Sequence, residues 1–205
     1  MKELSSLKNI IKIFRIILIC LALGIIFWLF YKDFVPNGQL VVENNFKKRS
    51  ALISGLYPFE RLRGIEKEAE IYYETIYIDP VYFDLTIPRF FKTAKVIIKY
   101  QNPSHNLFQL GLKDVNSDWN FLFQTIEDKD KGIEPQATGE WQEAAIDLNL
   151  EPWFIKDRKL YFILSSPLLY NNQKEIKISQ IKIILEREPW TFKNLSSRLK
   201  DYLKL

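Results

Sequence analysis

The chain has 205 residues, 47% hydrophobic and 15% aromatic, a composition that excludes a disordered protein. Its formal net charge of +4 comes from the two ends, because residues 38–190 are slightly acidic. Nucleic-acid binding needs a basic face against the phosphates, so we expect no nucleic-acid partner.

The first predicted element is a transmembrane helix over residues 10–31, which follows a short cytoplasmic segment at 1–9. The uncharged core of this helix, residues 16–31, is shorter than the roughly 20 residues that a bilayer requires. Lys12 and Arg15 lie within one turn of the core, and their long stems can reach the lipid headgroups. With these residues included, the predicted span is long enough to cross a membrane.

The residues that flank the helix predict its orientation. Trp28 and Tyr31 stand where an interfacial aromatic belt is expected. Basic residues gather before the helix core, so the positive-inside rule places the N-terminus in the cytoplasm. Small residues for a cleavage site are missing near the helix end, which favours a retained signal-anchor over a cleaved signal peptide. We therefore expect a single-pass protein of the cell membrane, with a linker at 32–37 and an extracytoplasmic C-terminal domain.

Residues 38–190 are predicted to form an all-β domain. Short runs of β-branched and aromatic residues alternate with turn signals such as Asp79-Pro80 and Asn102-Pro103. Short strands without helical segments between them favour an antiparallel β-sandwich of the jelly-roll type. We expect strands near 39–43, 69–78, 81–87, 94–101, 107–113, 119–126, 140–148, 159–165 and 175–186.

The alternation within these runs predicts which side chains face the core. In the strand at 94–101, one face carries Ala94, Val96, Ile98 and Tyr100, and the lysines point the other way. In the last strand, the isoleucines change parity at Ser179-Gln180, which predicts a β-bulge there.

Two segments carry a family resemblance. Trp141, the run LYFILSSP at Leu160–Pro167 and the closing strand at Ile176–Leu185 resemble the second half of galactose-binding-like jelly rolls, which include carbohydrate-binding modules. The run DPVYFDLTIPRFFKTAKVIIKYQN at 79–102 resembles their first half, and is similar to segments of uncharacterised membrane-anchored bacterial proteins. The single cysteine, Cys20, excludes an internal disulfide and also favours a bacterial source. The resemblance implies a β-sandwich and does not specify a ligand.

The resemblance also implies where a ligand would bind. Sugar-binding jelly rolls present exposed rings, on which pyranose faces stack, beside Asn, Asp or Arg side chains. The candidates at predicted strand ends or loops are Trp119, Trp153, Tyr170 and Asn171. The same rings could instead cap the core, because aromatic side chains bring the largest buried area.

Catalytic and metal-binding patterns are poorly represented. His105 is the only histidine, so His-ligated zinc and a Ser-His-Asp triad are absent, and we expect neither a cofactor nor an enzyme. Asp114, Asn116 and Asp118 alternate oxygen-bearing side chains as calcium loops do. The glycine and the glutamate of an EF-hand are missing, and a plain turn explains these residues better.

Residues 191–205 return to a helical period through Phe192, Leu195, Leu199 and Tyr202, which predicts a basic amphipathic helix. Such a helix could lie on a membrane, on a partner or on the domain itself. The expected function is a non-enzymatic, extracytoplasmic binding module for a cell-surface glycan or an envelope protein. The alternative is an accessory or structural subunit of a membrane complex, assembled through the anchor and the C-terminal helix.

Overall fold

The computed structural model describes residues 2–34, 38–88, 91–103, 107–117, 120–127, 140–167, 169 and 175–187, with the side chains of the helix described for residues 12–28. The chain divides into two compact units. One comprises residues 1–38 together with 189–205, and the other is Gln39–Glu188. The strands belong to the second unit.

The first unit contains the helix α1 (Lys2–Phe34), whose side chains from Lys12 to Trp28 are exposed. A helix is therefore present where the transmembrane helix was predicted. Within the described part of the chain, no helix combines the length and the apolar character that a membrane crossing requires. The anchor stays a prediction, and the predicted helix at 191–205 lies outside the described residues.

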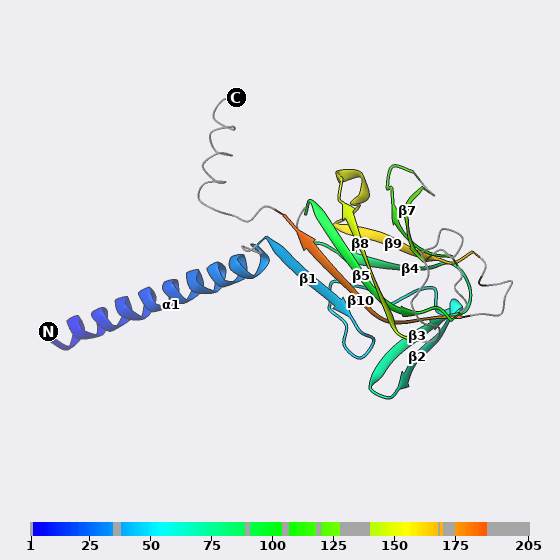
Figure 1. Ribbon diagram of the computed structural model, residues 1–205. Coiled ribbons are helices and arrows are strands. Elements are labelled where there is room, and N and C mark those ends of the chain that lie inside the picture. The colour runs from blue at the N-terminus through cyan, green and yellow to red at the C-terminus, as the bar shows by residue number, and fades with distance from the viewer. Residues whose placement is uncertain are drawn as a thin grey trace, which may run out of the picture. The chain divides into compact units, whose positions relative to one another are not determined.

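The second unit is a sandwich of two antiparallel sheets, which confirms the all-β fold expected from the sequence (Figure 1). Sheet A has the strand order β2-β3-β10-β5-β8, with β1 also paired to β10, and sheet B has the order β4-β9-β6-β7. The strands are β1 (Gln39–Asn44), β2 (Leu62–Glu68), β3 (Ile71–Ile76), β4 (Val81–Thr86), β5 (Thr93–Gln101), β6 (Phe108–Lys113), β7 (Phe121–Glu127), β8 (Gln142–Asn149), β9 (Lys159–Ser165) and β10 (Ile176–Glu186). Among the described residues, two short 3₁₀ helices, η1 (Phe59–Arg61) and η3 (Pro152–Phe154), lie in connections.

The core lies between the two sheets and follows the alternation of the strands. The predicted inward stripe of β5, from Ala94 to Tyr100, is buried. In sheet B, Phe83 and Phe162 are fully buried and stack with ring centroids 4.8 Å apart. Because each inward side chain is followed by an outward one, this core also determines which residues the outer faces present.

The predicted bulge in β10 is confirmed. Ile178 lies opposite Tyr100 and Gln180 lies opposite Lys99, so Ser179 is the extra residue. The other edge of β10 is shared by two strands, since β3 pairs with residues 176–178 and β1 pairs with residues 181–186. The bulge therefore falls where one edge strand ends and the other begins.

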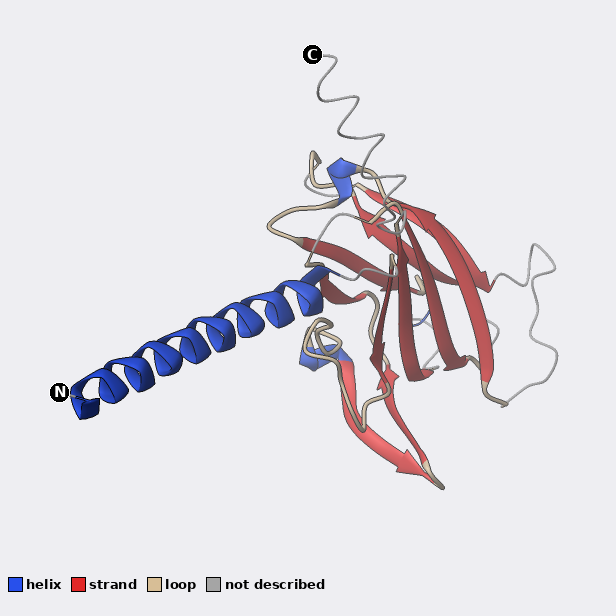
Figure 2. Ribbon diagram, turned by 90° about the vertical axis from the view of Figure 1, so that its left-hand side faces the viewer, coloured by secondary structure: helices blue, strands red, loops and turns tan. Residues whose placement is uncertain are grey.

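Strand β2 was missed from the sequence, and the strand predicted at 69–78 is shorter than expected. β2 pairs with β3 in a hairpin that projects from the sandwich (Figure 2). All residues of β2 after Leu62 are exposed, so the strand lacks an alternating apolar pattern. The turn between β2 and β3 places Ala69 at a φ of 53°. Glycine and asparagine are the residues that usually mark such a turn in a sequence, and alanine does not.

Candidate ligand-binding face

The outer face of sheet B is lined with aromatic side chains. Phe83 and Phe162 point inward, so Tyr82 on β4 and Tyr161 on β9 point outward, and both are half-buried. We call this surface the aromatic face, defined by Tyr57, Tyr82, Tyr161, Ile163, Phe121 and Phe123. An antiparallel sheet usually presents polar side chains to water on its outer side, so this composition is unusual.

Tyr57 extends the aromatic face beyond the edge of β4. It lies in the segment between β1 and η1, and its backbone N–H donates to the Tyr82 carbonyl oxygen at 2.9 Å. The Tyr82 N–H donates in return to the Tyr57 carbonyl oxygen at 2.7 Å. This pairing aligns the two rings, which stack with centroids 5.8 Å apart.

One ion pair accompanies these tyrosines. Asp84 lies opposite Tyr161, and its Oδ2 accepts a hydrogen bond from Lys159 Nζ at 2.9 Å. The hydrogen bond and the charge of Asp84 raise the pKa of Lys159. Burial, followed by the negative charge of Asp84, raises the pKa of Tyr57 to about 12. At neutral pH the Tyr57 hydroxyl is therefore protonated and can both donate and accept hydrogen bonds.

A glycine allows the aromatic face to continue across β6. Gly111 lies opposite Phe123 on β7 and Ile163 on β9. A Cβ atom at Gly111 would come within 2.5 Å of Ile163 Cγ2 and 3.0 Å of Phe123 Cε1. These two side chains occupy the space that a larger residue would fill, so Ile163 is only 6% exposed.

The resulting row crosses the whole sheet. Tyr82, Ile163, Gly111 and Phe123 occupy matched positions on β4, β9, β6 and β7. Neighbouring strands are separated by nearly 5 Å, so the row spans about 14 Å. Such a length suits an extended ligand better than a single small ring. Phe123 is 43% exposed at one end of the row.

Among the predicted ligand-binding residues, Trp153 is described, and it lies in η3 rather than on the aromatic face. It is 45% exposed, and its carbonyl oxygen accepts from the Val115 N–H at 2.9 Å. This hydrogen bond brings Trp153 beside the turn that contains Asp114 and Asn116. The other three candidates, Trp119, Tyr170 and Asn171, lie outside the described residues.

The weak calcium candidate forms a turn. Asp114 Oδ1 accepts from the Asn116 N–H at 2.9 Å, and the Ser117 N–H donates to the Asp114 carbonyl oxygen at 3.3 Å. One carboxylate oxygen of Asp114 is therefore engaged locally, as the plain-turn interpretation requires. Asp118 lies outside the described residues, and within the described part of the chain no three acidic, histidine or cysteine side chains form a metal-binding group.

The aromatic face was not singled out from the sequence, although part of its signal was visible. The segments VYFDLT and KLYFILS each contain a tyrosine followed directly by a phenylalanine. Neighbouring residues of a strand point to opposite faces, so one aromatic residue of each strand must face outward. Tyr57 had no such signal, because the segment around it has no alternating pattern.

No model of a protein family matches the sequence, and no curated protein matches it. Solved structures with a similar fold include the family 35 carbohydrate binding module from Clostridium thermocellum, at 12% identity and a TM-score of 0.42, covering 71% of this chain and 96% of that chain. The xylan-binding module CBM15 is 14% identical, with a TM-score of 0.46 and coverage of 74% and 99%. The CBM22-1 xylan-binding domain from Paenibacillus barcinonensis Xyn10C is 7% identical, with a TM-score of 0.44 and coverage of 72% and 94%. At these identities the similarity concerns the arrangement of strands and does not extend to a ligand.

Proposed function

We propose that this chain is a non-enzymatic glycan-binding module whose aromatic face stacks against a sugar chain. The observation that carries the proposal is the group of partly exposed aromatic rings of the aromatic face, on the outward side of sheet B. A contiguous apolar patch on an outer sheet face marks an interaction surface, because it costs free energy to leave it in water.

The chemistry of the face suits a sugar. A sugar ring presents both apolar C–H groups and hydroxyls, and tyrosine offers an apolar ring together with a polar hydroxyl. Asp84 and Lys159 add charged hydrogen-bonding groups beside the rings. Gln109 and Thr125, which face each other on the outward side of β6 and β7, add two more polar groups. Aromatic surface combined with a few fixed polar groups is the usual composition of small-molecule sites.

A protein partner is the second candidate. Leu122 and Phe123 are 48% and 43% exposed on β7, the edge strand of sheet B. Consecutive exposed apolar residues on an edge strand suit a protein surface, as in an accessory subunit of a membrane complex.

The proposal is tested with a glycan array and the purified full-length chain in detergent. Three proteins are compared: the wild type, the double variant Tyr82→Ala, Tyr161→Ala, and the single variant Trp153→Ala. We expect the double variant to lose binding by at least about tenfold while keeping its secondary structure, because each truncated ring removes a central contact. We expect Trp153→Ala to bind as the wild type does, because its exposed ring lies in a connection.

Two results would contradict the proposal. If the wild type bound no glycan, the second candidate, a protein partner, would become the favoured ligand. Loss of binding in Trp153→Ala alone would place the ligand at the β8–β9 connection instead of the aromatic face.

The proposed location is the outer side of a membrane, and its support is the sequence of residues 10–31. The long stems of Lys12 and Arg15, together with Trp28 and Tyr31, would place this segment across a bilayer with the sandwich outside. Alkaline carbonate extraction of membranes tests the anchor, and protease added to intact cells tests the orientation. We expect the chain to remain in the membrane fraction and the sandwich to be cleaved. Release by carbonate would contradict the anchor.

A further inference from the structure

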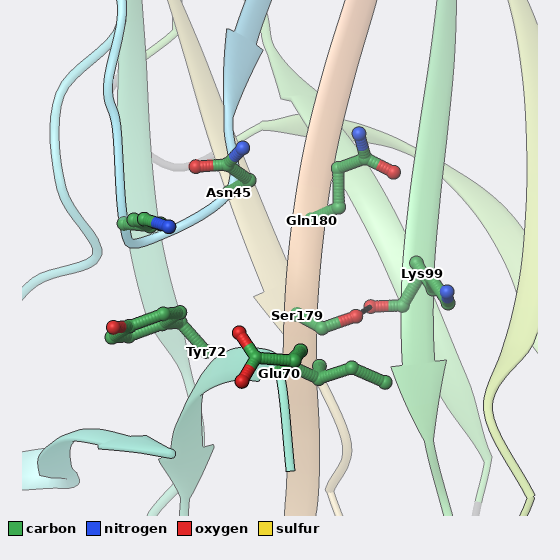
Figure 3. A pocket seen from close by; sticks show the side chains of 8 residues that line it. Asn45, Glu70, Tyr72, Lys99, Ser179 and Gln180 are labelled. Carbon is green, nitrogen blue, oxygen red and sulfur yellow. Dashed lines mark hydrogen bonds between the residues drawn. The ribbon is translucent and has the colours of Figure 1, made fainter. Parts of the chain in front are cut away.

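A pocket lies on the outer side of sheet A, at the bulge of β10. It is an open pocket of about 200 Å³, and the labelled side chains in Figure 3 surround a common space. Its lining is mostly polar and consists of Asn45, Lys47, Glu70, Ile71, Tyr72, Lys99, Ser179 and Gln180.

The pocket has a structural cause. β1 and β3 share one edge of β10, and the gap between their paired residues falls at Ser179 and Gln180. The segment after β1 supplies Asn45 and Lys47 on one side of the gap, and the start of β3 supplies Tyr72 on the other. Since a bulge changes the direction of its side chains, it opens the sheet where a regular ladder would close it.

The amide side chains in the pocket are held in place by one carboxylate. Glu43 Oε1 accepts from Gln180 Nε2 at 2.8 Å and from Asn45 Nδ2 at 3.4 Å. On the floor, Ser179 Oγ donates to the Lys99 carbonyl oxygen at 3.4 Å. The polar groups are therefore positioned before any ligand arrives, which lowers the entropy cost of binding.

The lining of the pocket carries two lysines and one glutamate. The glutamate, Glu70, is paired with Lys67 at 3.4 Å. Lys47 and Lys99 form no ion pair with any residue that the structure describes. Lys47 Nζ lies 5.7 Å from the centroid of the Tyr72 ring, which holds this cation beside the pocket. Two amines without carboxylate partners favour an anionic ligand.

We propose that this pocket is a second binding site, separate from the aromatic face, for an acidic sugar unit that carries a carboxylate or a sulfate group. The anionic group faces Lys47 and Lys99, and the sugar hydroxyls meet Asn45, Ser179 and Gln180. The inference deepens the proposed function, on which it rests for the choice of a sugar.

Titration of the labelled full-length chain in detergent, followed by NMR, tests the site with four probes: glucuronate, glucose 6-sulfate, glucose and inorganic sulfate. We expect the two acidic sugars to bind and to shift signals of residues around the pocket. Glucose should bind at least about tenfold more weakly, because a hydrogen bond to a charged group contributes more than a neutral one. Raising the salt concentration should weaken binding of the acidic sugars, because exposed charges are screened.

Variants locate the site. Lys99→Gln should reduce the affinity for the acidic sugars by about tenfold. Lys95→Gln is the matched control, since Lys95 is an exposed lysine on the same face of β5 and does not line the pocket. The double variant Tyr82→Ala, Tyr161→Ala should still bind the acidic sugars, because it leaves the pocket unchanged. The proposal for the aromatic face and the proposal for the pocket can therefore fail separately.

Three outcomes would overturn the inference. The first is equal affinity for glucose and glucuronate, which would show that the lysines do not bind the anionic group. The second is inorganic sulfate binding as tightly as the acidic sugars, which would show an adventitious anion only. The third is an equal loss of affinity in Lys95→Gln and Lys99→Gln, which would indicate a general effect of surface charge.

Discussion

The two outer faces of the sandwich differ sharply, although the inner faces are built in the same way. On sheet B the outward positions hold tyrosine, phenylalanine and isoleucine together with polar residues such as Asp84, Lys159 and Gln109. On sheet A the outward positions of β5, β10 and β8 include the charged residues Lys95, Lys99, Lys182, Glu143 and Asp147, together with Ile97 and Ile184. Core packing requires apolar inner faces, whereas the outer faces are free to differ, and the nearly buried Ile163 shows that outer side chains of sheet B also pack against one another.

The inner faces also differ at one position. Glu74 on β3 lies opposite Ile178, whose side chain is fully buried, so the carboxyl group shares the inner side of sheet A. Its Oε2 has no hydrogen-bond partner, and the residue is only 6% exposed. Sheet A therefore carries charged residue types on both faces, whereas the inner positions of β4, β9 and β6 in sheet B are apolar.

The largest predicted effect comes from placing a lysine, a residue typical of the outer face of sheet A, on the outer face of sheet B. Ile163→Lys places a cation within the aromatic face, where the native side chain is nearly buried. We expect a loss of about 2–3 kcal/mol in the free energy of unfolding, because the apolar contacts with neighbouring side chains are lost. Ile97→Lys on the outer side of β5 is the matched change, and its cost should stay below about 1 kcal/mol. Urea unfolding curves measure both, and equal losses would show that the two faces do not differ energetically.

The second prediction concerns Glu74 and pH. Burial raises the pKa of this carboxyl group from 4.5 to about 7, against the smaller opposing effect of Arg49. The folded protein therefore binds this proton more tightly than the unfolded chain does. The stability that the proton provides is complete below about pH 4.5 and is lost as the pH rises towards 7.

Glu74→Gln should remove this dependence on pH. We expect the variant to be about 1–2 kcal/mol more stable than the wild type at pH 8, with a smaller difference at pH 4.5. Thermal unfolding across this pH range measures the difference. Glu143→Gln, at an exposed position on the outer side of β8, should leave the profile unchanged. A wild-type profile in Glu74→Gln would mean that another group is responsible.

The same contrast explains how far the sequence could predict this structure. Alternating apolar residues determine which side of a strand faces the core, so the β5 stripe and the β10 bulge were both predicted. β2 was missed because its residues face water and have no periodicity. The aromatic face was missed because the register that aligns Tyr82, Ile163 and Phe123 depends on pairing between segments far apart in the chain. The pocket depends on the same long-range pairing, since β1 and β3 meet on β10.

The smallest predicted effect tests the glycine beneath the aromatic face. Gly111→Ala would place a methyl group against Ile163 and Phe123 in a packed row, which should cost about 1 kcal/mol of stability. Gly55→Ala is the matched control, because its methyl group would meet the end of the flexible Arg49 side chain, which can move away. We expect Gly111→Ala to weaken glycan binding as well, since Phe123 must shift, while Gly55→Ala binds normally. If Gly111→Ala lost stability and still bound with wild-type affinity, the ring of Phe123 would belong to the packing of sheet B and not to the ligand site.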